Sequence, residues 1–421
     1  MNGLMRRLTC RQCDKPLDQP PLVDLGLHYV SDFPKPEDWP PPETRRVPLE
    51  LVSCVHCGLA QLTYTTPRDW HYRGDYWYRS GINESMRSAL EDVVVSVLKI
   101  KPMRYSDVWI DIGANDGTLL ASVYDAAPGM MRVAVEPVPQ FSDELSGPAD
   151  MVIPDYWPCR YDGPKAQVIT SIAMFYDLDD PHAFVEAIKD ALAEDGVWIC
   201  QFTDLPAMLK SGDVGNICHE HLTYWSIFPL EELLHEHGLG LIDVTRNAVN
   251  GGSVRYFIGH RAKHLESHNV EAERILQWMN ANTSRIRDFN YKIEKVHAQF
   301  WLAWQKLKNM GCDVVDVYGA STKGNTLVQW LGLRRELIRW AIERSSAKFG
   351  RLTVNGIPIV GEEQGRQQPA DAWVVLPWHF RAGILKRERQ YLKNGGRVLF
   401  PQPEPEIVES GTVVKGEDGE R

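Results

Sequence analysis

Short apolar runs alternate with a helical period through the middle of the chain. The predicted strands there are residues 108–112, 131–137, 151–158, 166–178 and 197–204, and residues 180–196 have the spacing of an amphipathic helix. Apolar runs separated by helical segments predict a parallel sheet with helical crossovers. Residues 230–247 and 251–261 then predict a helix and two further strands, the antiparallel end of the same sheet.

The same alternation returns after a long helical stretch. Residues 267–310 have apolar positions three and four apart, which predicts a pair of packing helices. Residues 312–333 read as strand, glycine turn and helix, and further strands at 338–343, 372–380 and 395–404 complete a second, smaller α/β domain. We expect domains at 1–75, 76–262 and 311–408, a helical linker at 263–310 and a disordered tail at 409–421.

Composition narrows the class of protein. With 421 residues, 43% hydrophobic and 24% charged, the chain can bury more than one core. A net charge of −10 disfavours a nucleic-acid partner, which needs a clustered basic surface. The start of the chain lacks the apolar run of a signal peptide, and no stretch is long enough to cross a membrane, so a cytoplasmic protein without a membrane partner is expected.

The cysteines fall into two groups. Cys10, Cys13, Cys54 and Cys57 form two CxxC pairs, CRQC and CVHC, and the other four are scattered. Two such pairs predict a closed zinc site with four thiolate ligands, which stabilises a small domain and leaves no open position for catalysis. Reduced thiols without metal and a redox pair are the alternatives.

A ligand-binding turn is predicted in DVWIDIGANDGTLL, residues 107–120. An apolar strand leads into glycines and short polar residues, where a ligand can approach the backbone, and a helix follows. About 20 residues later the next strand ends in Glu136, an acid placed to bind a ribose diol. The candidate cofactor-binding residues of this sheet edge are Asp111, Gly113, Asn115, Asp116, Gly117, Glu136, Pro137, Asp155 and Tyr156. The turn lacks the GxGxxG pattern of NAD-binding domains.

Two further motifs carry candidate chemistry. In NICHEHLTYWS, residues 216–226, His219, Glu220 and His221 are adjacent, which suits a metal site, a general base with its neighbour, or the polar edge of a helix. Metal is disfavoured because adjacent side chains diverge and the HExxH spacing is missing.

In YGASTKGN, Lys323 stands at the start of a helix, which suits a phosphate or diphosphate although the order is not that of a Walker A loop.

Together these motifs resemble the sugar C-methyltransferases, S-adenosylmethionine (SAM)-dependent enzymes that act on nucleotide-linked 4-keto deoxysugars. The resemblance spans residues 8–405 and rests on the paired CxxC, YWYRSGINESM, DIGANDGTLL, FYDLDDP, HEHLTYWS, GGSVR and YGASTKGN. It implies an α/β fold: a class I SAM-methyltransferase Rossmann-like core between a small N-terminal zinc-binding module and a C-terminal Rossmann-like domain that helps to hold the nucleotide.

The resemblance also implies roles for individual residues. His221 aligns with the base of that family, which removes the proton next to the ketone so that the enolate attacks the methyl group. Glu220 is implied to be its partner, and Tyr78 aligns with a tyrosine that contacts the sugar. Candidate substrate contacts are Tyr176, Asp177, Cys218, Ser321, Lys323, Asn325 and Trp378. The expected cofactors are SAM and a structural Zn²⁺.

This chain departs from the best-known branch of the family at two places. Cys218 stands where that branch has a tyrosine, and FYDL at 175–178 replaces a segment that carries a histidine. The departures leave the sugar and the methylated carbon open. O- or N-methylation of a related metabolite and a non-catalytic zinc-containing scaffold are the alternative functions, and both a monomer and a homodimer remain open.

Overall fold

The computed structural model describes residues 3–72, 76–283 and 286–410; most of the predicted tail, residues 411–421, lies outside them. By its internal contacts the chain forms two compact units. The first comprises Met1–Leu27, Val47–Lys210 and His219–Arg287, and the second comprises His28–Arg46, Ser211–Cys218 and Asp288–Arg421.

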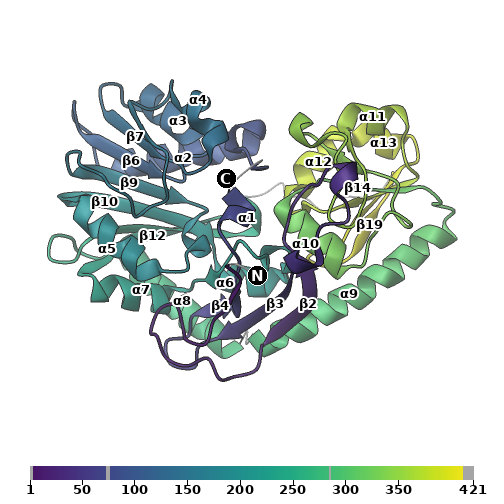
Figure 1. Cartoon of the computed structure of the whole chain (residues 1–421), viewed down its shortest axis with the longest axis horizontal. Helices are drawn as coiled ribbons and strands as arrows, with labels where there is room; N and C mark the ends of the chain where they lie inside the picture. Colours follow the sequence, from purple (N-terminus) through teal and green to yellow (C-terminus); the bar gives the residue numbers. More distant parts are fainter. Residues whose placement is uncertain (1–2, 73–75, 284–285, 411–421) are drawn as a thin grey trace. The chain divides into compact units, whose positions relative to one another are not determined.

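The first unit is built on a doubly wound sheet with the strand order β12-β13-β10-β9-β6-β7-β8 (Figure 1). Strands β10, β9, β6, β7 and β8 are parallel, and β13 is antiparallel to both of its neighbours. The strands are β6 Val108–Ile112, β7 Met131–Val135, β8 Met151–Ile153, β9 Ala166–Ile172, β10 Leu192–Thr203, β12 Leu239–Asn247 and β13 Ser253–His260. Its helices are α2 Glu84–Ile100, α3 Thr118–Ala126, α4 Ser142–Leu145, α5 Pro181–Ala191, α6 Leu205–Ser211, α7 Ile227–Glu236 and α8 His268–Thr283.

Alternate side chains of β6 face two separate cores. Val108, Ile110 and Ile112 pack in a cluster that includes residues of α5 and α7, whereas Trp109 packs in a cluster with α2 and α3. Helices therefore cover both faces of this sheet, as the continuous apolar strands predict. The expected α/β fold with a Rossmann-like methyltransferase sheet is confirmed.

Several predicted elements end earlier than their patterns suggest. The strand predicted at 151–158 ends at Ile153, and the strand predicted at 372–380 ends at Val375. The strand predicted at 166–178 ends at Ile172, because Ala173 adopts a left-handed φ of +57° and turns the chain away from the sheet. Residues Phe175–Asp177 then form a 3₁₀ turn, η5. The helix predicted to continue to residue 196 ends at Ala191, because the chain from Leu192 pairs with β9.

A smaller sheet joins the cysteine-containing segment to the HEHLTYWS segment. Its order is β11-β4-β3-β2, and β11 pairs with β4 through Thr223–Gln61 and Tyr224–Ala60. The elements are β2 Val23–Tyr29, β3 Arg46–Ser53, β4 Ala60–Leu62 and β11 Thr223–Tyr224; nearby are β1 Met5–Arg6, which pairs with β5 Tyr64–Thr65, and α1 Asp69–Tyr72.

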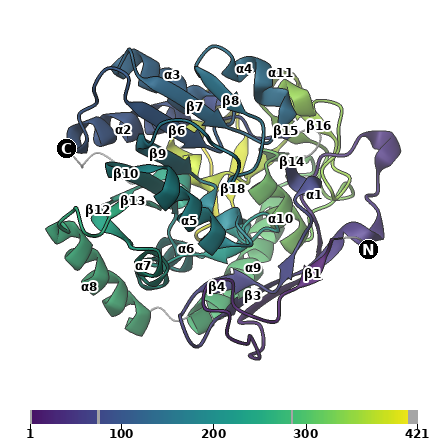
Figure 2. The same cartoon turned by 60° about the vertical axis from the view of Figure 1, so that its left-hand side comes forward.

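The second unit contains a six-stranded sheet with the order β16-β15-β14-β17-β18-β19, of which β14, β15, β16 and β18 are labelled in Figure 2. All neighbours are parallel except β18 and β19. The strands are β14 Val315–Tyr318, β15 Ala341–Glu343, β16 Ile359–Gly361, β17 Ala372–Val375, β18 Arg397–Phe400 and β19 Glu406–Val408. The helices are α9 Ile286–Asn309, α10 Thr322–Trp330, α11 Glu362–Gln367, α12 Arg381–Arg387 and α13 Arg389–Lys393.

The proline-rich stretch between the two CxxC pairs, residues 31–46, packs within this second unit. The backbone N–H of Leu352 donates to Pro34 O at 2.9 Å, and the indole N–H of Trp39 donates to Val354 O at 3.1 Å. The domain boundaries predicted at 75, 262 and 310 remain proposals, and the structure adds that residues 28–46 and 211–218 have their contacts with the C-terminal sheet.

Candidate active site

The turn after β6 is fastened to the acid at the end of β7. Gly113 has a left-handed φ of +73°, and a Cβ there would lie 3.3 Å from Met174 Cγ. The backbone N–H of Asn115 donates to Glu136 Oε2 at 2.8 Å, and that of Val138 donates to Oε1 at 2.9 Å. Because each carboxylate oxygen has two lone pairs, Glu136 can accept further hydrogen bonds from a ligand.

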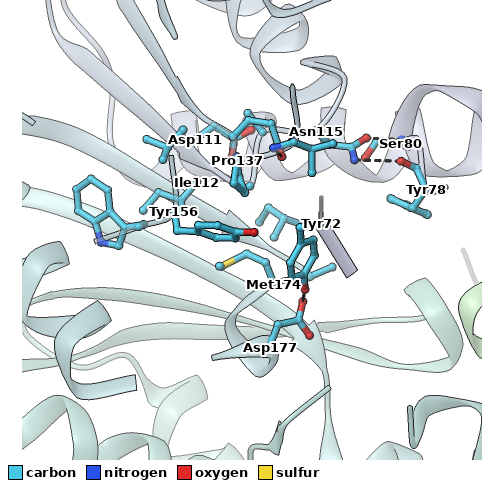
Figure 3. A pocket seen from close by; sticks show the side chains of 18 of the residues that line it. Tyr72, Tyr78, Ser80, Asp111, Ile112, Asn115, Pro137, Tyr156, Met174 and Asp177 are labelled. Carbon is cyan, nitrogen blue, oxygen red and sulfur yellow. Dashed lines mark hydrogen bonds between the residues drawn. The ribbon is translucent and has the colours of Figure 1, made fainter. Parts of the chain in front are cut away.

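The YWYRSGINESM segment is held against this turn. The side chain of Asn115 accepts the N–H of Ser80 at 3.0 Å and donates to Tyr78 O at 3.1 Å (Figure 3). The carboxylate of Asp116 accepts the N–H of Gly81 at 2.7 Å. The turn therefore positions Tyr78, whose side chain is 44% exposed, through backbone contacts.

A cavity lies where the parallel strands end (Figure 3). The predicted residues that line it are Tyr78, Asp111, Gly113, Asn115, Glu136, Pro137, Asp155, Tyr156 and Asp177. Asp116 and Gly117 were predicted for the same site but do not line the cavity. Asp116 binds the backbone of Gly81, and a Cβ on Gly117 would lie 2.5 Å from Pro148 Cγ.

Three residues on the aromatic side of the cavity, Arg68, Tyr72 and Tyr76, were not predicted as site residues, whereas Tyr156 was. Tyr72 and Tyr156 meet edge to face with ring centroids 6.1 Å apart, and Tyr72 lies 5.7 Å from Tyr76. The guanidinium of Arg68 lies 5.2 Å from the centroid of Tyr156. All four side chains line the cavity. The tyrosines at 72, 76 and 78 were the available signal; Tyr76 and Tyr78 both lie in the YWYRSGINESM motif, but only Tyr78 was assigned a role.

Two buried carboxyls line the inner part of the cavity. Burial raises the pKa of Asp111 to about 7, even though Thr170 Oγ1 donates to Asp111 Oδ1 at 2.6 Å. Burial also raises the pKa of Glu136, against the two backbone hydrogen bonds that lower it. Acids desolvated in this way favour a ligand that offers hydroxyl groups or positive charge.

Asp177 occupies the cavity wall that follows β9. Tyr72 Oη donates to Asp177 Oδ2 at 3.2 Å (Figure 3), and Asp177 Oδ1 is buried without a hydrogen-bond partner among the described residues. Burial raises the pKa of Asp177 well above its ordinary value, and the charge of Glu220 raises it further.

The HEHLTYWS segment is positioned by its pairing with β4. His219 is buried, and its Nε2 lies 3.2 Å from Val47 O. The ring of His221 packs 4.2 Å from the ring of Tyr176, centroid to centroid, and the hydroxyl of Thr223 donates to Tyr176 O at 3.1 Å. The candidate base is therefore packed on the residue that precedes Asp177.

Glu220 faces a histidine that the sequence did not single out. Glu220 Oε1 lies 3.6 Å from His71 Nδ1, and His71 Nε2 lies 2.7 Å from the hydroxyl of Thr66. The side chains of His71 and Glu220 are 4% and 14% exposed. The prediction that Glu220 assists His221 stays a prediction, and His71 joins the candidate site.

The four predicted zinc ligands lie together. The sulfurs of Cys10, Cys13, Cys54 and Cys57 are all within 4.8 Å of one another, with Cys10–Cys57 at 3.6 Å and Cys13–Cys54 at 3.5 Å. A tetrahedral zinc with Zn–S distances of about 2.3 Å places its sulfurs about 3.8 Å apart. Gln61 Nε2 donates to Cys10 Sγ at 3.0 Å, an outer contact that suits a metal-bound thiolate. The donor set and its spacing fit zinc.

The second unit repeats the strand, turn, helix and acid arrangement. Glu343, at the end of β15, accepts the N–H of Ala320 at 2.9 Å, as Glu136 accepts that of Asn115. Ser321 caps α10 by accepting the N–H of Gly324 at 3.0 Å. The structure thus contains this arrangement in each unit.

The remaining predicted substrate residues have different surroundings. Lys323 Nζ makes no hydrogen bond among the described residues and lies 3.9 Å from Asp213 Oδ2. Asn325 is 1% exposed and donates to Ser31 Oγ at 3.0 Å and Asp32 O at 2.9 Å, so its donors hold the proline-rich stretch. Two more candidates belong to the second unit: buried Cys218 and partly exposed Trp378.

Comparisons with known proteins match both units. Residues 82–244 match the family described as a methyltransferase domain, and residues 248–403 match the C-methyltransferase C-terminal domain. The chain is 27% identical over 381 residues to the C-methyltransferase NovU of Streptomyces niveus, which covers 87% of this chain and 89% of the relative.

Solved structures resemble part of the chain. A SAM-dependent methyltransferase from Clostridium acetobutylicum is 13% identical, with a TM-score of 0.34. The aligned region covers 41% of this chain and 91% of the methyltransferase. The mitomycin 7-O-methyltransferase MmcR is 20% identical, with a TM-score of 0.34, and covers 42% of this chain and 54% of that one.

Within the described residues, no helix has the length and apolar character needed to cross a membrane. The first family match covers the glycine turn at Gly113, the second covers the glycine turn at Gly319, and both agree with the resemblance predicted from the motifs. The comparisons therefore support the resemblance to the sugar C-methyltransferases, and the chain is a SAM-dependent methyltransferase.

Proposed function

We propose that this enzyme methylates the carbon next to the ketone of a nucleotide-linked keto deoxysugar. The choice of a nucleotide-linked substrate rests on one observation. The second unit has its own arrangement of a strand, a turn, a helix and an acid, in which Glu343 accepts the N–H of Ala320. The first arrangement, around Glu136, serves SAM, and the second offers the same geometry to a second nucleotide. A nucleotide-linked substrate explains why one chain has both.

SAM is expected in the cavity of the first unit. Glu136 would bind its ribose hydroxyls, the turn at Gly113 and Asn115 would contact its polar atoms, and Pro137 and Tyr156 would flank its base. Bound SAM supplies a methyl group activated by a positively charged sulfur. The buried carboxyls favour this cation, because it offsets the cost of ionising them in a desolvated site.

The second unit would hold the nucleotide of the substrate. The start of α10 and the ammonium of Lys323 suit its phosphates, with Ser321 at the same turn and Glu343 facing the ribose. Burial and the nearby charge of Lys323 lower the pKa of His379 to about 3, so this histidine is neutral and does not add a second charge. Lys323 is therefore the cation that we assign to phosphate.

His221 would act as the general base. Carbon becomes a nucleophile only after a proton next to the ketone is removed, and an imidazole with a pKa near neutrality can accept that proton. His221 packs on Tyr176 beside the cavity wall, which restricts its ring. Glu220 would favour the protonated imidazole, and Tyr78, Cys218 and Trp378 remain proposed contacts of the sugar.

The four cysteines would hold a structural zinc ion. With four thiolate ligands the metal has no open position for a substrate, so its contribution is to the fold of the segment that carries β4. Since β4 pairs with β11 of the HEHLTYWS segment, the metal would stabilise the strand that positions His221.

Isotope exchange in deuterated water tests this proposal directly. Keto deoxysugar nucleotides incubated with enzyme and a SAM analogue that lacks the transferable methyl should gain deuterium next to the ketone. With SAM, mass spectrometry should show the gain of one methyl group on carbon. Methylation without exchange would instead favour O- or N-transfer.

The variant His221→Ala separates the base from the binding site. It should lose exchange and methyl transfer, because no other group is assigned to remove the proton, while its SAM affinity by calorimetry stays within a few fold. An equal loss of SAM binding would show that His221 has a structural role and would refute the assignment of the base.

A further inference from the structure

Tyr72 and Asp177 form a polar pair in the cavity wall that no step above uses. Tyr72 comes from α1 and Asp177 from the turn η5, and the tyrosine hydroxyl donates to Asp177 Oδ2 at 3.2 Å. Figure 3 shows the hydroxyl of Tyr72 directed at the carboxyl of Asp177. Both side chains line the cavity in which SAM is expected.

The second oxygen of this carboxyl lacks a partner in the described part of the chain. Asp177 Oδ1 is buried and makes no hydrogen bond there. Buried polar atoms are nearly always hydrogen-bonded in a working protein, and Asp177 lines the cavity, so this unpartnered oxygen is a candidate contact for a bound molecule. The cavity is the space that Asp177 shares with such a molecule.

The neighbouring charges favour a neutral carboxyl at this position. Burial disfavours ionisation of Asp177 and raises its pKa, and the charge of Glu220 acts in the same direction; these two effects outweigh the hydrogen bond from Tyr72, which lowers the pKa. Glu220 itself lies 3.6 Å from His71. A carboxyl kept neutral in this way can donate a hydrogen bond to an oxygen that develops negative charge.

We propose that Asp177, held by Tyr72, donates a hydrogen bond to the ketone oxygen of the substrate and stabilises the enolate. The inference rests on the proposed function and adds to it the group that bears the enolate charge. Hydrogen bonds aimed at a developing oxyanion are among the largest contributions to catalysis in a water-excluded site.

The electrons and protons of the step balance. His221 takes the proton, the electron pair of the broken C–H bond forms a carbon–carbon double bond, and the carbonyl pair moves to oxygen, where Asp177 Oδ1–H donates. The pair then returns as carbon forms its bond to the methyl group. The bond between methyl and sulfur breaks with its electrons left on sulfur, so the sulfonium becomes a neutral thioether.

The test compares two replacements at position 177. Asp177→Asn keeps a neutral donor of similar shape, whereas Asp177→Ala removes it. We expect kcat for exchange to fall by about 100-fold to 1,000-fold in Asp177→Ala and by less than about tenfold in Asp177→Asn. Tyr72→Phe should reduce kcat by roughly tenfold, because the carboxyl loses its orienting hydrogen bond. SAM affinity should stay within a few fold in all three.

Tyr105→Phe is the matched control, because Tyr105 is 85% exposed and lies outside the cavity lining; it should retain the wild-type rate. If Asp177→Asn loses as much activity as Asp177→Ala, the carboxyl acts as an anion and the proposal is wrong. A parallel loss of SAM affinity in both variants would assign Asp177 to the sulfonium of SAM instead and would also overturn it.

An infrared measurement separates this inference from the proposed function. The difference spectrum between the wild type and Asp177→Asn, both with SAM bound, should contain the carbonyl band of one protonated carboxyl group. If the wild-type enzyme neither exchanges deuterium into keto sugars nor methylates them, the proposed function is refuted. The infrared band would still test whether the carboxyl of Asp177 is neutral. Absence of the band would refute the donor role of Asp177.

Discussion

Replacement of Arg11 by methionine should destabilise the first unit far more than replacement of an exposed arginine. Arg11 lies inside the CRQC pair, and its side chain is 0% exposed. Its Nε donates to Asp179 Oδ1 at 3.0 Å, its Nη1 to Leu62 O at 2.7 Å and its Nη2 to Thr65 Oγ1 at 2.7 Å. Burial lowers the pKa of Arg11 to about 10, so the guanidinium is still charged at neutral pH.

The magnitude follows from what Arg11→Met leaves behind. The Asp179 carboxylate would lose its nearer, fully buried cation and keep Arg7 at 3.7 Å, and Leu62 O and Thr65 would lose a charged donor. Breaking a buried ion pair from one side costs about 3–5 kcal/mol. The Asp179 side chain is 23% exposed and can be partly hydrated, so we expect the lower end, about 3 kcal/mol.

Arg160→Met is the matched control. Arg160 pairs with Asp162 at 2.6 Å, but the two side chains are 88% and 71% exposed. Exposed pairs contribute about 0–1 kcal/mol, so this variant should stay within that range of the wild type. Both variants remove one arginine and one ion pair, and they differ in burial.

Hydrogen exchange measured by mass spectrometry is the suitable assay, because a chain with two compact units does not unfold in a single step. Protection should fall in residues 61–66 and 176–180 of Arg11→Met and remain unchanged in the second unit. A loss below about 1 kcal/mol, equal to that of Arg160→Met, would refute the view that the Arg11–Asp179 pair joins the cysteine segment to the core.

Two further outcomes are expected. Burial raises the pKa of Asp111 to about 7, well above its value in an unfolded chain, so the stability of the first unit should fall as pH rises from about 4 to about 7 and stay low above it. Asp111→Asn should therefore be more stable than the wild type near pH 8, by up to about 4 kcal/mol, but not near pH 4, as measured by hydrogen-exchange protection of β6 and β9; equal differences at both pH values would contradict the assignment. Chelation should remove roughly one zinc per chain and reduce hydrogen-exchange protection in β4 and β11. Cys57→Ser should have the same effect, whereas Cys159→Ser should retain the metal. Elemental analysis measures the metal content, and an unchanged content in Cys57→Ser would contradict the four-cysteine site.

The sequence predicted the sheets well, because its signals there are local. Parallel strands buried on both faces read as continuous apolar runs, and a turn that must bring backbone to a ligand needs glycine, as at Gly113. The acid at the end of the next strand, Glu136, is part of the same short pattern. These residues lie within about 25 positions of one another, so spacing alone brought them together.

Contacts between distant segments were not predictable in this way. Asn325 was selected for its place in YGASTKGN, but its amide is occupied by Ser31 and Asp32, nearly 300 residues away in the chain. His71 and Tyr72 belong to no motif, and only the packing of α1 shows that they face Glu220 and Asp177.

The segment from Gln61 to Tyr72 explains why the cysteine module and the cavity belong to one unit. Gln61 donates to Cys10 Sγ at 3.0 Å, and four residues later the Thr65 hydroxyl donates to Asp179 Oδ1 at 2.6 Å. Thr66 lies 2.7 Å from His71, and Tyr72 donates to Asp177 at 3.2 Å. These contacts all come from one stretch of 12 residues, so a shift of this stretch at the cysteines should reach the carboxyls of both Asp177 and Asp179. A zinc ion held by the four cysteines would therefore influence where the side chains of the cavity wall lie, even though four thiolate ligands leave it no open position for a substrate.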